Sequence, residues 1–137
     1  MRIMAAVMAV ALSSVPGFAQ EAEPSPWQTV ITAQIEAFRD GDGVAALEWA
    51  GAGFKTQFED PDLFYQAILA SGYEPIVNSR SHSFGDFQQV GEMGAIQVVR
   101  LVGPDQGLYE ALYQMLEEAD GWRVQGVALR EEEGLGI

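Results

Sequence analysis

The chain has 137 residues, with 20 acidic and 7 basic side chains, one histidine and no cysteine, and its net charge is −13. The length fits a single domain, and the lack of cysteine excludes disulfides and a lipid-modified amino-terminal cysteine. The negative charge disfavours nucleic acid and anionic lipid as partners, and we interpret it mainly as an aid to solubility.

Residues 1–19 have the pattern of a signal peptide. Arg2 supplies a positive start, residues 3–12 form an apolar run, and Gly17-Phe18-Ala19 provides small residues where a signal peptidase cuts. The apolar run is too short to span a bilayer. We therefore expect cleavage near Ala19, a periplasmic or secreted protein without membrane anchoring, and a linker over residues 20–25.

The first helix is predicted to begin at Ser25-Pro26-Trp27-Gln28. This stretch has a hydroxyl cap, a proline in the first turn, and a glutamine placed to complete a capping box. The helix should end at Asp40-Gly41, and Asp42 should cap the next one. The side chains that follow at helical spacing on one face are Trp27, Val30, Ile31, Gln34, Ile35 and Phe38.

Two more short helices are expected, over residues 44–50 and 60–72. The second of these starts at Asp60-Pro61, a cap followed by a proline. Between them, Phe54 and Phe58 have the spacing of a single helical turn. The side chains predicted to be buried are Val44, Leu47 and Trp49 from the first of these helices and Leu63, Phe64, Ala67 and Ile68 from the second.

The rest of the chain predicts an antiparallel sheet. Gly85 would permit a bulge that points Phe84 and Phe87 to the same side, and Asp120-Gly121 predicts a two-residue type I′ hairpin. The expected strands are residues 78–90, 95–102, 108–116 and 122–129. Residues 132–137 are expected to be a disordered acidic tail, and the run Glu131-Glu132-Glu133 to be solvated.

Alternation predicts that both faces of this sheet are partly apolar. One face could hold the helices, and the other could meet a second copy of the protein. In the third strand, Tyr109, Ala111, Tyr113 and Met115 share one face, and Leu108, Leu112 and Leu116 share the other. In the last strand, Trp122, Val124 and Ala128 are expected to oppose Val127 and Leu129.

Helices followed by an antiparallel sheet make an α+β order. Several blocks follow one another in a recognisable order, among them Gln34-Ile35-Glu36-Ala37-Phe38, Tyr73-Glu74-Pro75-Ile76, Phe84-Gly85, Gln97-Val98-Val99, Tyr109-Glu110-Ala111-Leu112-Tyr113-Gln114-Met115 and Asp120-Gly121-Trp122-Arg123-Val124-Gln125-Gly126. Their order resembles a family of secreted bacterial proteins, the domain-of-unknown-function family 4864, within the nuclear-transport-factor-2-like (SnoaL-like) cone superfamily. The resemblance implies a cystatin-like roll over residues 26–131, in which three helices pack on a curved sheet, with a pocket between them and frequent dimers. It implies no catalytic residue.

Metal chemistry is not expected. A transition-metal site needs several nitrogen or sulfur ligands, and His82 is the single histidine; it is expected half-exposed on a strand, titrating near pH 6.5 at a pocket mouth. Asp40-Gly41-Asp42-Gly43 lacks the later ligands of a calcium loop and is better explained as a helix stop and cap. No cofactor is expected either.

The preferred hypothesis is a non-catalytic binding or accessory module with an apolar cone cavity for a small ligand or peptide. Two alternatives remain open. One is a lyase, isomerase or hydrolase in which Asp86 or Asp62 is the base and Tyr109 or Tyr113 stabilises an oxyanion. The other is a structural dimer that docks a partner on its sheet. The expected ligand-binding residues are Phe38, Trp49, Phe64, His82, Tyr109, Tyr113 and Trp122.

Overall fold

The computed structural model describes residues 23–132; the predicted signal peptide and residues 133–137 lie outside the described part. Within it, helices precede a four-stranded antiparallel sheet, which confirms the predicted α+β class. Five helices are present where three were predicted. The elements are α1 (Pro26–Arg39), α2 (Gly43–Glu48), α3 (Ala52–Gln57), α4 (Pro61–Ala70), α5 (Glu74–Val77), β1 (Ser81–Val90), β2 (Gly94–Val102), β3 (Leu108–Glu118) and β4 (Gly121–Glu131).

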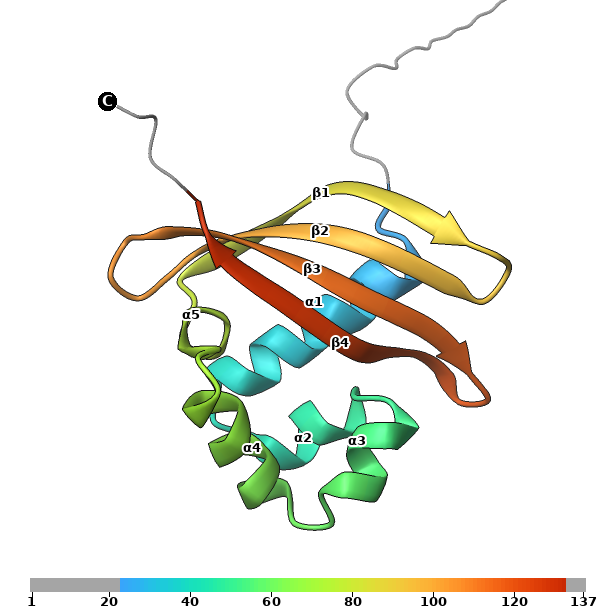
Figure 1. The fold of residues 1–137 in the computed structure, drawn as a ribbon, viewed down its shortest axis with the longest axis horizontal. Helices are drawn as coiled ribbons and strands as arrows, with labels where there is room; N and C mark the ends of the chain where they lie inside the picture. The colour runs from blue at the N-terminus through green and yellow to red at the C-terminus, as the bar shows by residue number, and fades with distance from the viewer. Residues whose placement is uncertain (1–22, 133–137) are drawn as a thin grey trace, which may run out of the picture.

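The sheet has the simple order β1-β2-β3-β4, and the helices all lie on one of its faces (Figure 1). Helix α1 crosses directly beneath the curved sheet, while α2, α3 and α4 form a further layer below it. The opposite face of the sheet is not covered by any described element. The molecule is therefore a sheet with one covered and one open face.

Capping interactions define the helix ends much as the sequence predicts. The backbone N–H of Ser25 donates to Gln28 Oε1 at 3.0 Å at the start of α1, and Gly41 follows its end with a φ of +70°. The Asp42 carboxylate accepts from the Ala45 N–H at 3.0 Å, and Asp60 accepts from the Asp62 N–H at 2.9 Å. These side chains satisfy backbone donors that have no partner inside the helix.

Two predicted core residues of the short helices are exposed instead. Val44 is 67 % exposed and Leu63 is 61 % exposed. A helix of six to ten residues makes only two or three turns, so its apolar spacing leaves the buried face poorly determined. Helix α5 was not predicted because four residues are too few to show the helical spacing of apolar side chains.

The predicted bulge in β1 is present and is held by a buried glutamine. Phe84 pairs with Val99 and Phe87 with Gln97, so both phenylalanines lie on the helix side of the sheet. Gln97 has no exposed surface, and its Nε2 donates to the carbonyl oxygens of Gly85 at 3.0 Å and Asp86 at 3.3 Å. A polar side chain in the core thus satisfies the carbonyls that the bulge leaves unpaired.

A second bulge, at Gln125 in β4, overturns the predicted faces of the last strand. The pairing skips from Val124 to Gly126, so the alternation reverses after Gln125. Trp122 and Val124 consequently share the helix side with Val127 and Leu129, all of which belong to the core beneath the sheet, whereas Ala128 is exposed.

The β3–β4 hairpin does not have the predicted type I′ turn. Glu118 pairs with Gly121, so Ala119 and Asp120 form the turn. Gly121 has a φ of +119°, while Asp120 does not have a positive φ. A type I′ turn needs positive φ at both central residues, so that prediction was wrong.

The acidic run at the end of β4 is partly structured. Glu131 pairs with Tyr109, and the Glu132 N–H donates to the Leu108 carbonyl at 2.8 Å. Glu132 Oε2 also lies 3.9 Å from Arg100 Nε. Glu131 is exposed, as predicted for a solvated run, although its backbone belongs to β4; Glu132 is half-buried, and the remaining tail lies outside the described residues.

Two separate hydrophobic cores result from this arrangement. The larger lies between α1 and the sheet and includes Ile31, Ile35 and Val99. The smaller lies among the end of α1, α2 and α4, and its buried side chains include Phe64 and Ala46. Where the two cores meet, the side chains do not fill the space.

Candidate functional site

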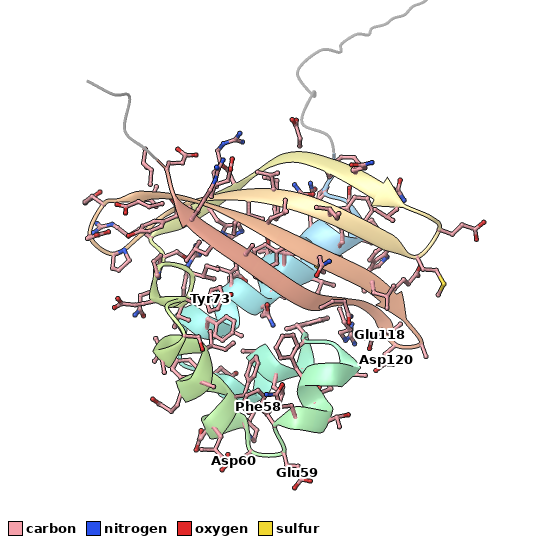
Figure 2. The ribbon with its side chains drawn as sticks, in the orientation of Figure 1. Phe58, Glu59, Asp60, Tyr73, Glu118 and Asp120 are labelled. Carbon is pink, nitrogen blue, oxygen red and sulfur yellow. The ribbon has the colours of Figure 1, made fainter. Side chains whose placement is uncertain are left out.

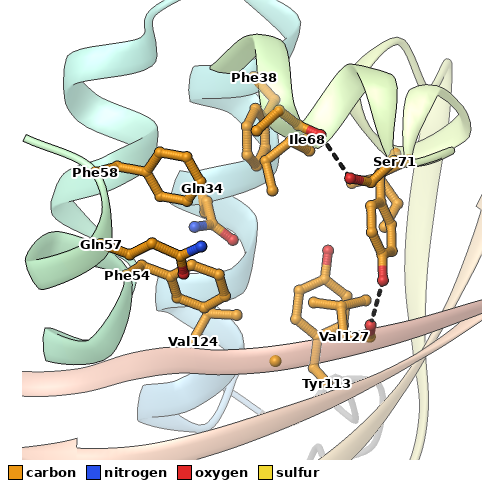
Figure 3. A pocket seen from close by; sticks show the side chains of 14 residues that line it. Gln34, Phe38, Phe54, Gln57, Phe58, Ile68, Ser71, Tyr113, Val124 and Val127 are labelled. Carbon is orange, nitrogen blue, oxygen red and sulfur yellow. Dashed lines mark hydrogen bonds between the residues drawn. The ribbon is translucent and has the colours of Figure 1, made fainter. Parts of the chain in front are cut away.

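A cavity of about 330 Å³ lies where the two cores meet, between β3 and β4 on one side and α3 and α4 on the other. Figure 3 shows its wall. Among the described residues that line it, none is charged. Its apolar side chains are Phe38, Phe54, Phe58, Ala67, Ile68, Ile76, Val124 and Val127, and its polar ones are Gln34, Gln57, Ser71, Tyr73 and Tyr113.

The aromatic part of the wall is supported from behind by Phe64. This residue is 2 % exposed, and its ring centroid lies 6.0 Å from Phe38, 5.9 Å from Phe54 and 5.6 Å from Phe58. Close aromatic packing of this kind restricts how the three outer rings can move. The wall is therefore pre-formed rather than assembled around a ligand.

Two tyrosine hydroxyls reach the cavity, and they differ in their partners. The Tyr73 hydroxyl donates to the Val127 carbonyl oxygen at 2.8 Å. Tyr113 is 1 % exposed, and its hydroxyl points into the cavity without a hydrogen-bond partner among residues 23–132 (Figure 3). Burial, together with nearby Tyr73, raises the pKa of Tyr113 well above its usual value although Arg39 opposes this, so the hydroxyl stays neutral.

The third buried polar group is Gln34 on α1. It is 4 % exposed, and its Nε2 donates to the Ala46 carbonyl oxygen at 2.9 Å. Because a carbonyl can only accept, this bond determines which end of the amide is the donor. The Gln34 side-chain oxygen remains as an acceptor at the cavity (Figure 3).

Acidic side chains surround the cavity at a distance but do not enter it. Figure 2 shows Glu59 and Asp60 at the α3–α4 turn, on the side of the helices away from the sheet, and Glu118 and Asp120 at the β3–β4 hairpin. The exposed lining residues, Gln57 and Ser71, are uncharged. The interior is therefore neutral although the chain as a whole is strongly acidic.

The structure brings two of the seven expected ligand-binding residues to the cavity, Phe38 and Tyr113. Phe64 lies behind the wall, as described. Trp122 packs on Trp27, with ring centroids 5.2 Å apart, in the core between α1 and the sheet. Trp49, at the end of α2, lies under Arg123 of β4, whose guanidinium carbon is 5.0 Å from the centroid of the Trp49 ring. Tyr109 packs against the loop of residues 103–107.

His82 is half-exposed on β1, as expected, and lies between β1 and α1; it lines a separate hollow of about 190 Å³, together with Tyr109, and not this cavity. Its Nδ1 is 3.1 Å from Arg39 Nη2, and its Nε2 is 3.1 Å from Thr32 Oγ1. Because arginine only donates, Nδ1 must accept, so the ring is neutral with its proton on Nε2. Burial, reinforced by Arg39 and opposed by Glu36, lowers the pKa of His82.

The two candidate bases lie outside the cavity. Asp62 is exposed in the first turn of α4, and Asp86 is exposed at the β1 bulge. Tyr109 does not line the cavity, so only Tyr113 of the proposed catalytic pairs reaches it. No carboxylate among the described lining residues is available to abstract a proton.

Several lining residues were missed by sequence reasoning. Gln34 left a signal, since it is a polar residue within an apolar helical stripe. Phe54 and Phe58 showed the spacing of one turn, but nothing in that spacing indicated that they face a cavity. Tyr73 gave no signal because it caps α5, which was not predicted.

The described residues form neither a metal site nor a membrane-spanning helix. Across residues 23–132, no three His, Asp or Glu side chains lie close enough to hold a metal ion together. None of the described helices combines the length and the apolarity that crossing a bilayer requires.

Comparison with known proteins gives a family and a fold. A solved crystal structure of a domain of unknown function with a cystatin-like fold, from Nostoc punctiforme PCC 73102, is similar with a TM-score of 0.52 and 15 % identity, over 78 % of this chain and 75 % of that one. At this identity the likeness shows the fold alone. No curated protein matches the chain significantly. Residues 20–137 match the family described as Domain of unknown function (DUF4864), and the chain therefore belongs to that family.

Proposed function

We propose that this domain is a non-catalytic binding module whose cavity takes up a small, uncharged, mainly apolar ligand. The observation that supports this is the cavity itself, which is pre-formed, lined by uncharged residues and of a size usual for small-molecule sites. Transfer of an apolar ligand from water to such a wall is favourable without any charge pairing. The lack of a lining carboxylate in the described part gives the catalytic alternative no base.

The superfamily of this domain and the cellular location of the protein are also part of the proposal. We assign the domain to the nuclear-transport-factor-2-like (SnoaL-like) cone superfamily, supported by the curved sheet that covers helices with a cavity between them. We place the mature protein in the periplasm or outside the cell, supported by the signal-peptide pattern of residues 1–19. Sequencing the amino terminus of exported protein tests this location, and a start far from Gln20 would contradict it.

Binding can be tested with N-phenyl-1-naphthylamine, an uncharged dye that fluoresces in apolar surroundings. The expected result is a saturable rise in fluorescence with the wild-type protein. Ala67→Phe should abolish the rise, because it places a ring in the cavity. The matched control is Ala128→Phe, which adds the same ring to the open sheet face.

Thermal unfolding of each variant shows that it is folded, and Ser71→Phe provides a second block, at an exposed lining residue. Equal dye binding by wild type and both blocking variants would overturn the proposal, as would complete absence of binding to the wild type.

A second candidate function is self-association through the open sheet face. Three leucines form a row there on β3: Leu108 is 53 % exposed, Leu112 is 43 % and Leu116 is 41 %. We propose a second copy as the occupant. The same face carries Arg100 and Arg130 beside Glu110 and Glu132, so its charges are nearly balanced although the chain is strongly acidic. Repulsion between two copies is smallest where such balanced faces meet.

A further inference from the structure

The cavity has a polar end as well as an apolar wall, and this end specifies the ligand further. We infer that the ligand carries a neutral hydroxyl group, held by the Tyr113 hydroxyl and the Gln34 side-chain oxygen, on a body that packs against the phenylalanine wall. This inference rests on the proposed function, since it names the chemical class that the cavity accepts.

The Tyr113 hydroxyl is the first support for it. A hydroxyl that faces a cavity without a protein partner can form its hydrogen bonds only with water or with a ligand in that cavity. The fold satisfies the neighbouring Tyr73 hydroxyl internally, through Val127. It leaves the Tyr113 hydroxyl unpartnered among residues 23–132 and aimed into the cavity. A group that binds this hydroxyl therefore gains a hydrogen bond that the protein does not supply.

Gln34 limits what that group can be. Its Nε2 is engaged by Ala46, so its oxygen presents an acceptor and the ligand must present a donor. The Tyr113 hydroxyl can donate or accept. One ligand hydroxyl meets both demands, because it can donate to Gln34 and accept from Tyr113.

A carboxylate fits this end poorly. It has no proton to offer the Gln34 oxygen, and the described lining supplies no cation to offset its loss of water. The acidic surface of the chain also disfavours the approach of an anion. The expected class is therefore a neutral alcohol or phenol with an apolar body, and the packed rings of Phe38, Phe54 and Phe58 favour an aromatic one.

Three compounds with one skeleton separate these possibilities: 4-butylphenol, butylbenzene and 4-butylbenzoate. Each competes with N-phenyl-1-naphthylamine for wild type and for Tyr113→Phe, which removes only the hydroxyl. The readout is the ratio of the dissociation constants of butylbenzene and 4-butylphenol, because the different hydrophobicities of the two compounds cancel when the ratio is compared between proteins. We expect the ratio to fall about three- to tenfold in Tyr113→Phe, as for one lost hydrogen bond.

Tyr109→Phe is the control, because it removes the same hydroxyl from a tyrosine that does not line the cavity; it should leave the ratio within about twofold of wild type. Thermal unfolding should show Tyr113→Phe to be as stable as wild type, since no protein bond is lost. If the dye binds but the ratio is unchanged in Tyr113→Phe, or the benzoate binds as tightly as the phenol, the inference is wrong and the proposed function stands. If neither the dye nor any compound binds, the proposed function fails and this inference with it.

Discussion

The two cavity tyrosines offer a test at the scale of single atoms. Tyr73→Phe should lower the free energy of unfolding by about 1 kcal/mol, because it breaks the bond to the Val127 carbonyl. Tyr113→Phe should leave it unchanged within about 0.5 kcal/mol, because its hydroxyl has no partner in the described residues. Urea unfolding of both variants makes the comparison, and equal losses would show that the Tyr113 hydroxyl is satisfied within the protein.

Gln97 is a buried side chain whose amide forms several hydrogen bonds between α1, β1 and β2. Besides the bulge carbonyls, its Oε1 accepts from Trp27 Nε1 at 2.9 Å and from Gln28 Nε2 at 3.0 Å. Gln97→Leu should lower the free energy of unfolding by about 2–4 kcal/mol, because it leaves several buried groups unpaired. Gln114→Leu, at an exposed position of β3, should change it by less than about 0.5 kcal/mol. Similar losses for both in urea unfolding would contradict this role.

At the scale of elements, His82 makes the contact between α1 and β1 sensitive to pH. Because the folded pKa of His82 lies below its unfolded value of 6.5, the unfolded chain binds the proton more readily. Its contribution to stability is complete above pH 6.5 and is lost as the pH falls towards the folded pKa. Urea midpoints at about pH 7.5 and about pH 5 should therefore differ more for wild type than for His82→Gln; an equal difference would exclude His82 as a cause.

The helix that closes the cavity, α3, is attached to the sheet by a few polar contacts rather than by burial. None of its residues is buried. Glu118 on β3 accepts from the Ala52 N–H at 3.2 Å and from Gln125 Nε2 at 2.9 Å, and Ala50 bridges to Val124 at the edge of β4. The bond from Gln125 is the main cause that lowers the pKa of Glu118, which keeps this carboxylate charged at neutral pH.

For the whole molecule, the difference between its two sheet faces leads to a prediction about assembly. Light scattering of the mature protein at high micromolar concentration should give the mass of a dimer, because a second copy would bury the apolar side chains of the open face. Leu112→Glu should give a monomer, since the new charge lies in the middle of the leucine row. Leu63→Glu, at a residue of α4 that is even more exposed than Leu112, should remain a dimer. A wild-type monomer would rule out this interface.

What the sequence determined by itself is local in character. Asp42 and Asp60 cap the helices that follow them, the glycine in β1 marks its bulge, and β3 alternates as its residues indicate. Each of these features depends on side chains within a few positions of one another, so spacing alone is enough to predict it. The family resemblance followed from the order of such local blocks.

The tertiary structure alone decided where the cavity lies and which groups face it. The reversal at Gln125 put Val127 on the helix side, and the unpredicted turn at α5 brought Tyr73 beside it. Trp49, Trp122 and Tyr109 are aromatic, like several of the lining residues, but they pack elsewhere. The cavity is the space left between two cores that pack separately, and its position depends on how those cores meet, which no periodicity within one segment can encode.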